Sequence, residues 1–214
     1  MELSVNTFVS LDGVMQGPAG ADEDTSGGFG RGGWLVPYAD QDMGRIVEQD
    51  WFARADAFLL GRTTYQLMYP YWSAVTDPQN QVATALNTLP KFVVSRSMTD
   101  GAADWRDTTT VISGDVIEEI RKLKQRPGRE LQIHGSWQLA RAAHEAGLVD
   151  VFRLLVFPVA VCAGKRLFDE ASAPASFTVE SAETTSAGMT SLTLRPAAFA
   201  AGNVAVVDGR ESVG

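Results

Sequence analysis

Three short stretches of this sequence place glycines, hydroxyl groups and arginines directly after an apolar run. They are Gly61-Arg62-Thr63-Thr64, Ser95-Arg96 and Gly135-Ser136. The backbone N–H groups at a helix start bind anions because they are unpaired and lie at the positive end of the helix dipole. An arginine adds a planar fork that contacts phosphate in a bidentate way. One such turn is common in α/β proteins, but three together predict a ligand that carries several phosphates.

The elements that would position these turns alternate between strand and helix. Short β-rich apolar runs indicate strands, and apolar residues at helical spacing indicate the helices between them. The expected strands are residues 2–9, 57–60, 91–95, 109–113 and 130–134. The expected helices are residues 40–54, 63–68 (ended by Pro70), 79–86, 115–124 and 137–146. This alternation predicts parallel strands joined by crossover helices.

The pattern changes after residue 150, where strand-like runs follow one another without a helix between them. They are residues 151–161, 176–185, 190–195 and 204–207. Such runs pair antiparallel, and we expect them to complete the same sheet. The predicted fold is therefore α/β, a mixed sheet with a parallel centre, antiparallel C-terminal strands and helices on both faces. The carboxyl ends of parallel strands share one edge, where ligands of open α/β sheets bind.

The composition of the chain argues against several classes of function. The chain has 214 residues, a formal net charge of -8 and a single cysteine. These values predict a single cytoplasmic domain without a metal site, a membrane span or a basic nucleic-acid-binding face. Neither a nucleoside-triphosphate loop nor a G-x-G-x-x-G directly after a strand is present.

The segment from Gly13 to Gly33 is rich in glycine and leaves the first strand at the predicted ligand-binding edge. Connections of this length are usually functional or mobile, so we expect a lid over the site. The alternative is a surface insertion without a role in binding.

In order along the chain, several motifs resemble the dihydrofolate reductase-like superfamily, in the branch of the reductase domain of the bacterial riboflavin-biosynthesis deaminase-reductase and its stand-alone relatives. They are Ser10-Leu11-Asp12-Gly13, the residues 55–65, the residues 91–96, Gly135-Ser136, the residues 146–150, the residues 156–159 and the residues 164–168. Each motif is short, but together they span nearly the whole chain in the family's order.

This resemblance implies a dihydrofolate reductase-like reductase domain in residues 1–200, with 201–214 as its last short strand and tail. It implies NADPH as hydride donor and a small pterin- or pyrimidine-like molecule as substrate. The turn Gly61-Arg62-Thr63-Thr64 would then bind the cofactor phosphates, Ser95 and Arg96 the adenosine end with its 2′-phosphate, and Gly135 and Ser136 the pyrophosphate. Ser10 and Asp12 would lie near the nicotinamide.

The resemblance also implies an acidic residue on the first helix that supports protonation of the substrate. Aligning Trp51 and Phe52 with the family's aromatic pair makes Glu48 this residue, with Asp50 as the alternative. We therefore take Asp12 and Glu48 as the candidate catalytic residues, although a solvated surface acid is an equal interpretation of Glu48. Lys165 and Arg166 either reach a substrate phosphate or are the solvated charges of a turn.

Two further alternatives follow from the residues. His134, at a strand end beside Gly135, either donates to the ligand or is a buried, hydrogen-bonded histidine. The chain is either a reductase or a member of the fold that binds a nucleotide or pterin without turnover. In both cases we expect a homodimer, with the apolar run 151–161 as its interface.

Overall fold

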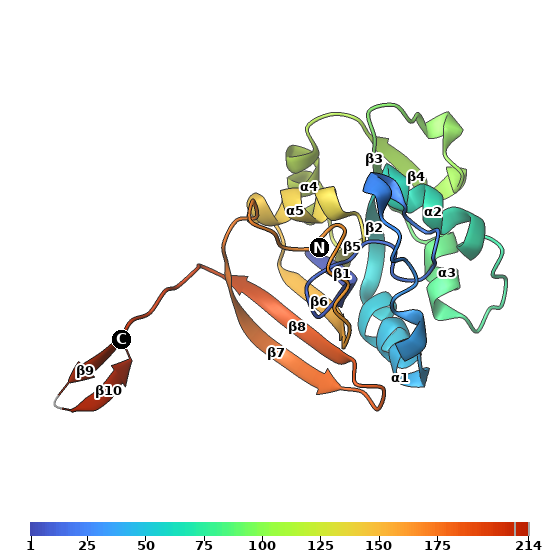
Figure 1. The fold of residues 1–214 in the computed structure, drawn as a ribbon. Coiled ribbons are helices and arrows are strands. Elements are labelled where there is room, and N and C mark those ends of the chain that lie inside the picture. The colour runs from blue at the N-terminus through green and yellow to red at the C-terminus, as the bar shows by residue number, and fades with distance from the viewer. Residues whose placement is uncertain (208, 214) are drawn as a thin grey trace.

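The computed structural model describes residues 1–207 and 209–213 and shows one large mixed sheet flanked by helices (Figure 1). The eight strands lie in the order β4-β3-β2-β5-β1-β6-β8-β7. Their bounds are β1 Glu2–Ser10, β2 Ala55–Gly61, β3 Lys91–Val94, β4 Thr109–Ile112, β5 Glu130–His134, β6 Val151–Phe157, β7 Ser176–Thr184 and β8 Thr190–Ala197. The first six strands run parallel, whereas β8 pairs antiparallel with both β6 and the edge strand β7. The predicted mixed sheet is thus confirmed.

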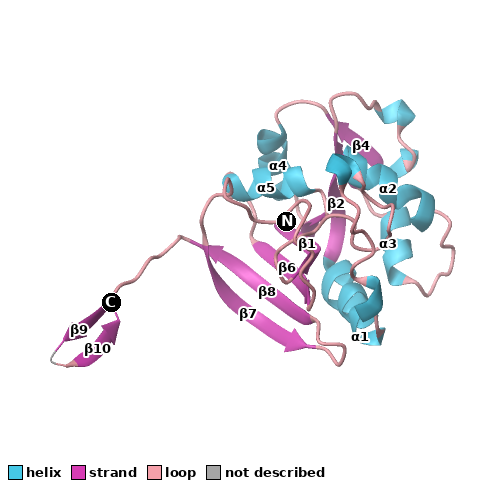
Figure 2. Cartoon of the chain, viewed as in Figure 1, coloured by secondary structure: helices cyan, strands magenta, loops and turns pink. Residues whose placement is uncertain are grey.

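The helices cover both faces of this sheet, as expected. Their bounds are α1 Gln41–Arg45, α2 Arg62–Trp72, α3 Gln81–Thr88, α4 Val116–Lys124 and α5 Trp137–Glu145. Short or irregular turns are η1 Ser26–Gly28, η2 Val36–Tyr38, η3 Ile46–Trp51, η4 Phe52–Arg54, η5 Asp100–Ala102 and η6 Arg106–Thr108. Figure 2 shows that the β7–β8 ribbon extends beyond the helices and is left uncovered by them.

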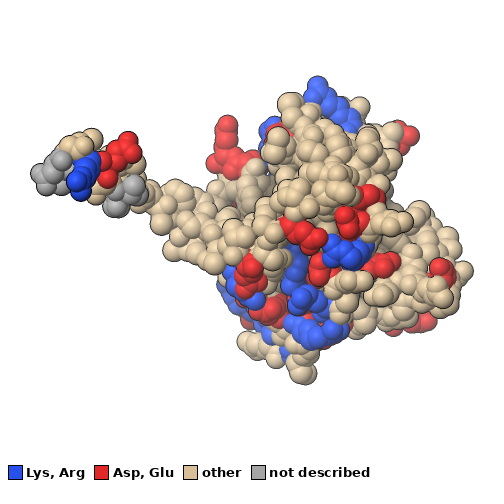
Figure 3. Space-filling model, turned by 90° about the horizontal axis from the view of Figure 1, so that it is seen from below, with Lys and Arg blue, Asp and Glu red and all other residues tan. Residues whose placement is uncertain are grey.

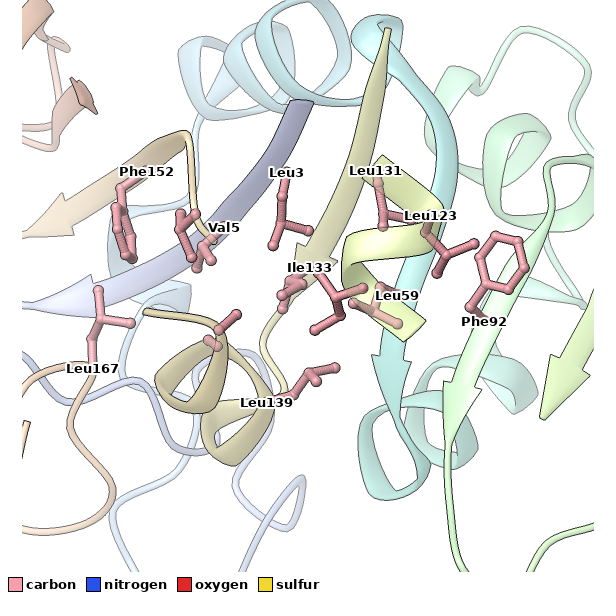
Figure 4. Close-up of a cluster of buried hydrophobic side chains, with 14 of the residues drawn as sticks. Leu3, Val5, Leu59, Phe92, Leu123, Leu131, Ile133, Leu139, Phe152 and Leu167 are labelled. Carbon is pink, nitrogen blue, oxygen red and sulfur yellow. The ribbon is translucent and has the colours of Figure 1, made fainter. Parts of the chain in front are cut away.

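Strand side chains alternate between two hydrophobic cores because successive residues of a strand point to opposite faces. Leu59, Leu131 and Ile133 pack with Leu123 of α4 and Leu139 of α5 on one face. Figure 4 shows these side chains directed from the strands toward the two helices. The second core, on the other face, joins the strands to the elements between residues 46 and 86, and its members include Ile46, Trp51, Phe58, Leu60, Tyr65 and Leu86.

Two local predictions were wrong. Pro70 does not end the helix that begins after Gly61, because α2 continues to Trp72 with Pro70 in its last turn. A backbone N–H at residue 70 would have met the carbonyl of Gln66, and Gln66 is an exposed residue. The expected helix over 40–54 is broken into α1, a π-helical turn (η3) and a 3-10 turn (η4).

The last strand was also wrongly placed. Residues Val204–Val207 (β9) do not join the main sheet but pair with β10, Arg210–Val213, in a separate two-stranded sheet. Figure 1 shows this hairpin at the end of an extended segment, away from the body of the domain. The assignment of residues 201–214 to the same domain stays a prediction.

Candidate active site at the carboxyl edge of the sheet

The three predicted turns lie on one edge of the sheet. They follow β2, β3 and β5, which run parallel, so their carboxyl ends point the same way. The chain leaves β2 toward the outer strands β3 and β4, but leaves β5 toward β6 on the other side of β1. The strand order therefore reverses between β2 and β5, which is the position where open α/β sheets bind ligands.

Direct hydrogen bonds join the turns that follow β2 and β5. The amide of Gly61 donates to the Ser136 hydroxyl at 3.0 Å, and the amide of Ser136 donates to the Thr64 hydroxyl at 3.1 Å. Gly135 and Ser136 both have positive φ, 55° and 49°. A Cβ at Gly135 would lie 3.5 Å from the methyl group of Thr64, so the turn and the helix start are in close contact. The two predicted glycine turns form one continuous surface.

The helices that begin at this surface lack the usual side-chain cap. Helices α1, α3 and α4 are capped by Asp40, Asn80 and Asp115, whose side chains accept amide hydrogen bonds. In contrast, α2 begins after Gly61, and the side chain of Ser136 at the start of α5 makes no capping bond. An uncapped helix start leaves backbone N–H groups available to an anion. Helices α2 and α5, which begin where the strand order reverses, are thus suited to bind phosphate.

Two exposed arginines lie beside these helix starts. Arg62 donates to the hydroxyl of Ser97 at 2.5 Å, which connects the turn after β2 to the turn after β3. Arg96 is exposed, and among the described residues neither arginine pairs with a carboxylate. Both therefore keep a charge that a phosphate group can use.

The hydroxyls nearby differ in their availability. Ser95 is buried and accepts the amides of Ser97 and Met98, so it shapes its own turn. Thr63 is exposed at the first turn of α2. Ser10 is buried, accepts the amide of Val14 and donates to Asp12 at 2.7 Å. Of these three, only the Thr63 hydroxyl is free to meet a cofactor.

Asp12 holds the segment after β6 against the end of β1. Its carboxylate accepts the amides of Val161 and Cys162 at 2.8 and 2.9 Å, and a guanidinium N–H of Arg166 at 3.2 Å. Partial burial raises the pKa of Asp12, but these bonds and the one from Ser10 lower that pKa far more, to well below its usual range. Such a carboxylate stays ionised and fully bonded, which favours a structural clamp over a proton donor.

The glycine-rich segment is fastened to the same 161–167 turn. The ammonium group of Lys165 donates to Asp24 at 2.6 Å and to Ser26 at 2.7 Å, and its amide donates to Gln16. Gly164 has a φ of 97°, and a Cβ there would lie 2.8 Å from the ring of Phe29. Lys165 and Arg166 are thus not free cations, because both are bound to carboxylates of the segment between residues 12 and 26.

A pocket of about 460 Å³ lies between this segment, the 163–169 turn and the start of α5. Its lining includes Gln16, Phe29, Trp137, Lys165 and Asp169. Trp137 directly follows Ser136, so the pocket adjoins the candidate phosphate surface. The geometry therefore provides an edge whose groups are suited to an anion, with a partly apolar pocket beside it.

The candidate acids of the first helix are not among the residues that line this pocket. Glu48 and Asp50 are half-buried in η3, whose residues Ile46 and Trp51 pack against the sheet. Neither carboxylate has a hydrogen-bond partner among the residues that the structure describes. Their catalytic assignment stays a prediction.

A buried polar network was missed by the sequence analysis. Arg153 of β6 crosses β1 and binds Glu130 of β5 through two hydrogen bonds of 2.8 Å. Ser4 and Gln132 also donate to Glu130. The signal in the sequence was polar residues at a spacing of two in strands otherwise rich in apolar residues, namely Ser4 and Asn6, and Glu130, Gln132 and His134.

His134 belongs to this network, so the buried alternative is confirmed. Its ring stacks on Phe52 with centroids 4.6 Å apart, and Nε2 lies 2.9 Å from the Gln132 side-chain oxygen. Burial, together with the charge of Arg153, lowers the pKa of His134 to about 3. The imidazole is therefore neutral at physiological pH and is not a cation for the ligand.

Charges on the face drawn in Figure 3 are interspersed, with lysines and arginines next to acidic residues. Within the described part of the chain, no group of three His, Cys, Asp or Glu side chains is arranged to hold a metal ion. None of the helices in residues 1–207 and 209–213 has the length and apolar character required to span a bilayer.

Comparison with known sequences identifies relatives over most of the chain. A family model described as the RibD C-terminal domain matches residues 2–191. The "Uncharacterized protein YyaP" of Bacillus subtilis (strain 168) is 30% identical over 162 residues, which are 75% of this chain and 76% of that protein.

Solved structures share the fold. A "Putative riboflavin biosynthesis protein" from Shewanella sp. PV-4 aligns with a TM-score of 0.70 and 22% identity over 92% of this chain and 99% of that one. A pyrimidine reductase-like protein from Corynebacterium diphtheriae aligns with a TM-score of 0.61 and 14% identity over 92% of both chains.

A diaminohydroxyphosphoribosylaminopyrimidine deaminase/5-amino-6-(5-phosphoribosylamino)uracil reductase from Thermotoga maritima aligns with a TM-score of 0.55 and 15% identity. The alignment covers 92% of this chain but 56% of that one. These structures show that the fold is dihydrofolate reductase-like, as the sequence motifs implied.

Proposed function

The chain belongs to the RibD C-terminal domain family, and from this premise we propose that it is an NADPH-dependent reductase of a small heteroaromatic substrate. The family and the fold make it a reductase-like protein. The cofactor and the substrate class are the parts that we propose.

The observation that carries the cofactor proposal is the junction of the two glycine turns. Gly61, Ser136 and Thr64 are tied by the hydrogen bonds of 3.0 and 3.1 Å, and the helices that start there have no side-chain cap. A pyrophosphate bound at this junction would receive the free N–H groups of both helices. When bound, NADPH supplies the hydride, while the chain binds and orients it.

The arginines extend this surface toward the adenosine end of the cofactor. Arg62 is held beside the turn after β3 by Ser97, and Arg96 belongs to that turn. A guanidinium without a carboxylate partner is suited to the 2′-phosphate that distinguishes NADPH from NADH. We therefore assign Arg96 to this phosphate and Arg62 to the neighbouring phosphates.

Titration of the protein with NADPH and NADH, followed by calorimetry, tests this assignment. We expect NADPH to bind about 10- to 100-fold more tightly than NADH, the difference that a charge-assisted hydrogen bond supplies. Arg96→Ala should remove most of this preference. Arg106→Ala is the matched control, because Arg106 is exposed but precedes β4 at the opposite edge of the sheet. The proposal is contradicted if the wild type does not bind NADPH, or if Arg96→Ala binds NADPH with the same affinity as the wild type.

For the proton that accompanies hydride transfer we propose Glu48, whose carboxylate is half-buried and not engaged by described residues. Glu48→Gln should lower the turnover of an accepted substrate, measured as the rate of NADPH consumption. Unchanged turnover in Glu48→Gln would move the assignment to Asp50.

The second candidate function is the binding of a nucleotide or pterin without turnover. The contacts of Asp12 favour it, because this carboxylate already accepts hydrogen bonds from Val161, Cys162 and Arg166. Tight NADPH binding without NADPH consumption across pterins, pyrimidines and quinones would support this second function and contradict the first.

We also propose that the protein is a homodimer, although not through the 151–161 run. Residues 151–157 form β6, which is flanked by β1 and β8 and buries most of its side chains within its own chain. The surface that remains available for a dimer interface is on the β7–β8 ribbon, where Val179 is 57% exposed. Light scattering that shows a monomer at micromolar concentration would contradict this proposal.

A further inference from the structure

Arg62 is the first residue of α2 and follows Gly61 at the carboxyl end of β2. Its guanidinium makes two hydrogen bonds to exposed, uncharged side chains. The Nε–H group donates to the side-chain oxygen of Gln66 at 3.2 Å, and an Nη1–H group donates to the hydroxyl of Ser97 at 2.5 Å. Gln66 lies one turn further along α2, whereas Ser97 belongs to the turn after β3. The two bonds therefore hold the guanidinium between these two elements.

The turn that carries Ser97 is itself fixed by a buried residue. The hydroxyl of Ser95 accepts the amides of Ser97 and Met98 at 3.3 and 3.0 Å. Ser95 is 7% exposed, and its amide donates to the carbonyl of Ile112 at the end of β4. The Ser97 hydroxyl thus reaches Arg62 from a turn that is bonded to the sheet.

The partners of Arg62 differ in kind from those of seven other arginines. Those seven pair with carboxylates, and they are Arg45, Arg121, Arg129, Arg141, Arg153, Arg166 and Arg195. The side-chain oxygens of Gln66 and Ser97 are uncharged, so they orient the guanidinium of Arg62 without compensating its charge. In a chain with a formal net charge of -8, a cation kept in this way is the group that a phosphate ligand requires.

Orientation of the guanidinium before binding favours the bound state. A long side chain loses rotamer freedom when a ligand immobilises it, and this loss lowers the affinity. The two hydrogen bonds of Arg62 remove part of that loss in advance. A guanidinium has five N–H donors, and Gln66 and Ser97 use two of them, so the others remain for a ligand.

We propose that Gln66 and Ser97 are positioning residues, which hold Arg62 in one orientation without neutralising it and so raise the affinity of the carboxyl edge for a polyphosphate ligand. The proposal rests on the proposed function, in which Arg62 binds phosphates of the cofactor. It adds that two uncharged side chains determine how strongly this arginine acts.

Calorimetric titration of the full chain with NADPH tests the proposal in a double-mutant cycle. We expect Ser97→Ala and Gln66→Ala each to weaken NADPH binding about two- to fivefold, the effect of losing one hydrogen bond that acts indirectly. Neither substitution should weaken binding further when it is combined with Arg62→Ala, because no guanidinium is then left to orient. The same loss in the Arg62→Ala background would overturn the proposal, since the side chain would then act without Arg62.

The substitution Gln66→Glu separates orientation from charge. A glutamate keeps an acceptor for Arg62 but neutralises it, so NADPH binding should weaken about tenfold, more than in Gln66→Ala. Gln125→Glu is the matched control, because it adds the same charge to an exposed residue that precedes β5 at the opposite edge of the sheet. This control should bind NADPH as the wild type does. Binding by Gln66→Glu that is as tight as that of Gln66→Ala would overturn the requirement for an uncharged partner.

A conservative variant and an unfolding measurement exclude a merely structural effect. Ser97→Thr retains the hydroxyl and should bind NADPH as the wild type does, whereas a loss as large as that of Ser97→Ala would overturn the role of the hydroxyl. Because Gln66 and Ser97 are exposed, denaturant unfolding should give the same midpoint for their variants as for the wild type. A lowered midpoint would assign the loss of binding to the fold instead.

The wild-type titration distinguishes failure of this proposal from failure of the proposed function. Absence of NADPH binding by the wild type contradicts the cofactor assignment. NADPH binding that neither Ser97→Ala nor Gln66→Ala weakens contradicts the positioning role alone.

Discussion

The hydroxyl of Ser136 accepts the backbone N–H of Gly61 at 3.0 Å, although the two residues are 75 positions apart in the sequence. This single bond joins the carboxyl ends of β2 and β5 at the point where the strand order reverses. It also takes the side chain of Ser136 away from capping its own helix. The contact therefore both fixes the edge and keeps the start of α5 open to an anion.

Ser136→Ala should weaken NADPH binding, because the two turns lose the bond that holds them in register. We expect a loss of about three- to tenfold in affinity and about 1 kcal/mol in the free energy of unfolding. Calorimetric titration and denaturant unfolding measure the two effects. The control is Ser113→Ala, since Ser113 is exposed and follows β4 at the same edge but away from the junction. If both variants bind NADPH as the wild type does, the junction does not form the cofactor site.

Asp12→Asn should loosen the glycine-rich segment and the turn after β6. The amide keeps one acceptor oxygen and loses its charge, so the bonds to Val161, Cys162 and Arg166 cannot all persist. Hydrogen exchange should become faster in residues 13–33 and 161–167 and stay unchanged in α4. A variant with unchanged exchange but abolished turnover would instead show that Asp12 acts in catalysis.

Removing one partner of the Glu130–Arg153 pair should be strongly destabilising. Both side chains are more than nine-tenths buried, so Arg153→Met would leave the Glu130 carboxylate without its counter-charge. We expect a loss of about 3–5 kcal/mol in the free energy of unfolding, measured by denaturant titration. The double variant Glu130→Leu with Arg153→Met should recover a large part of this loss. Equal instability of the single and double variants would refute an unpaired buried charge as the cause.

Mild acid should destabilise the protein through His134. The folded state keeps this imidazole neutral down to a pKa of about 3, whereas the unfolded chain protonates it below about 6.5. Unfolding therefore takes up a proton in this window, and the free energy of unfolding should fall by about 1.4 kcal/mol for each pH unit between 6 and 4.5.

The variant His134→Gln isolates this effect. It lacks the titrating ring, so its free energy of unfolding should be lower at pH 7 but nearly constant from pH 6 to 4.5. The lowered pKa values of Asp12, Asp24 and Asp56 act at more acidic pH, because those carboxylates titrate normally near 4. An equally steep slope in His134→Gln would assign the pH dependence to another group.

Much of the architecture could be predicted because it follows from the local spacing of apolar residues along the chain. The alternation of strands and helices between residues 55 and 145 implied parallel pairing, and the turns after β2, β3 and β5 were expected at one edge. Where the prediction was wrong, the local signal was ambiguous. Pro70 lies in the last turn of α2, which continues two residues beyond it, and the apolar run 204–207 pairs with a neighbouring strand of its own.

The strand and helix pattern, the turns with glycine, hydroxyl and arginine residues, and the family could be predicted because they depend on residue types and on short spacings. Which polar groups stay available to a ligand depends instead on tertiary contacts. Asp12 is bound by Val161 and Arg166, and Lys165 by Asp24, across separations of 141 to 154 residues. Pairing at such separations leaves no periodic trace in the chain, since it arises when the segments meet at the sheet edge.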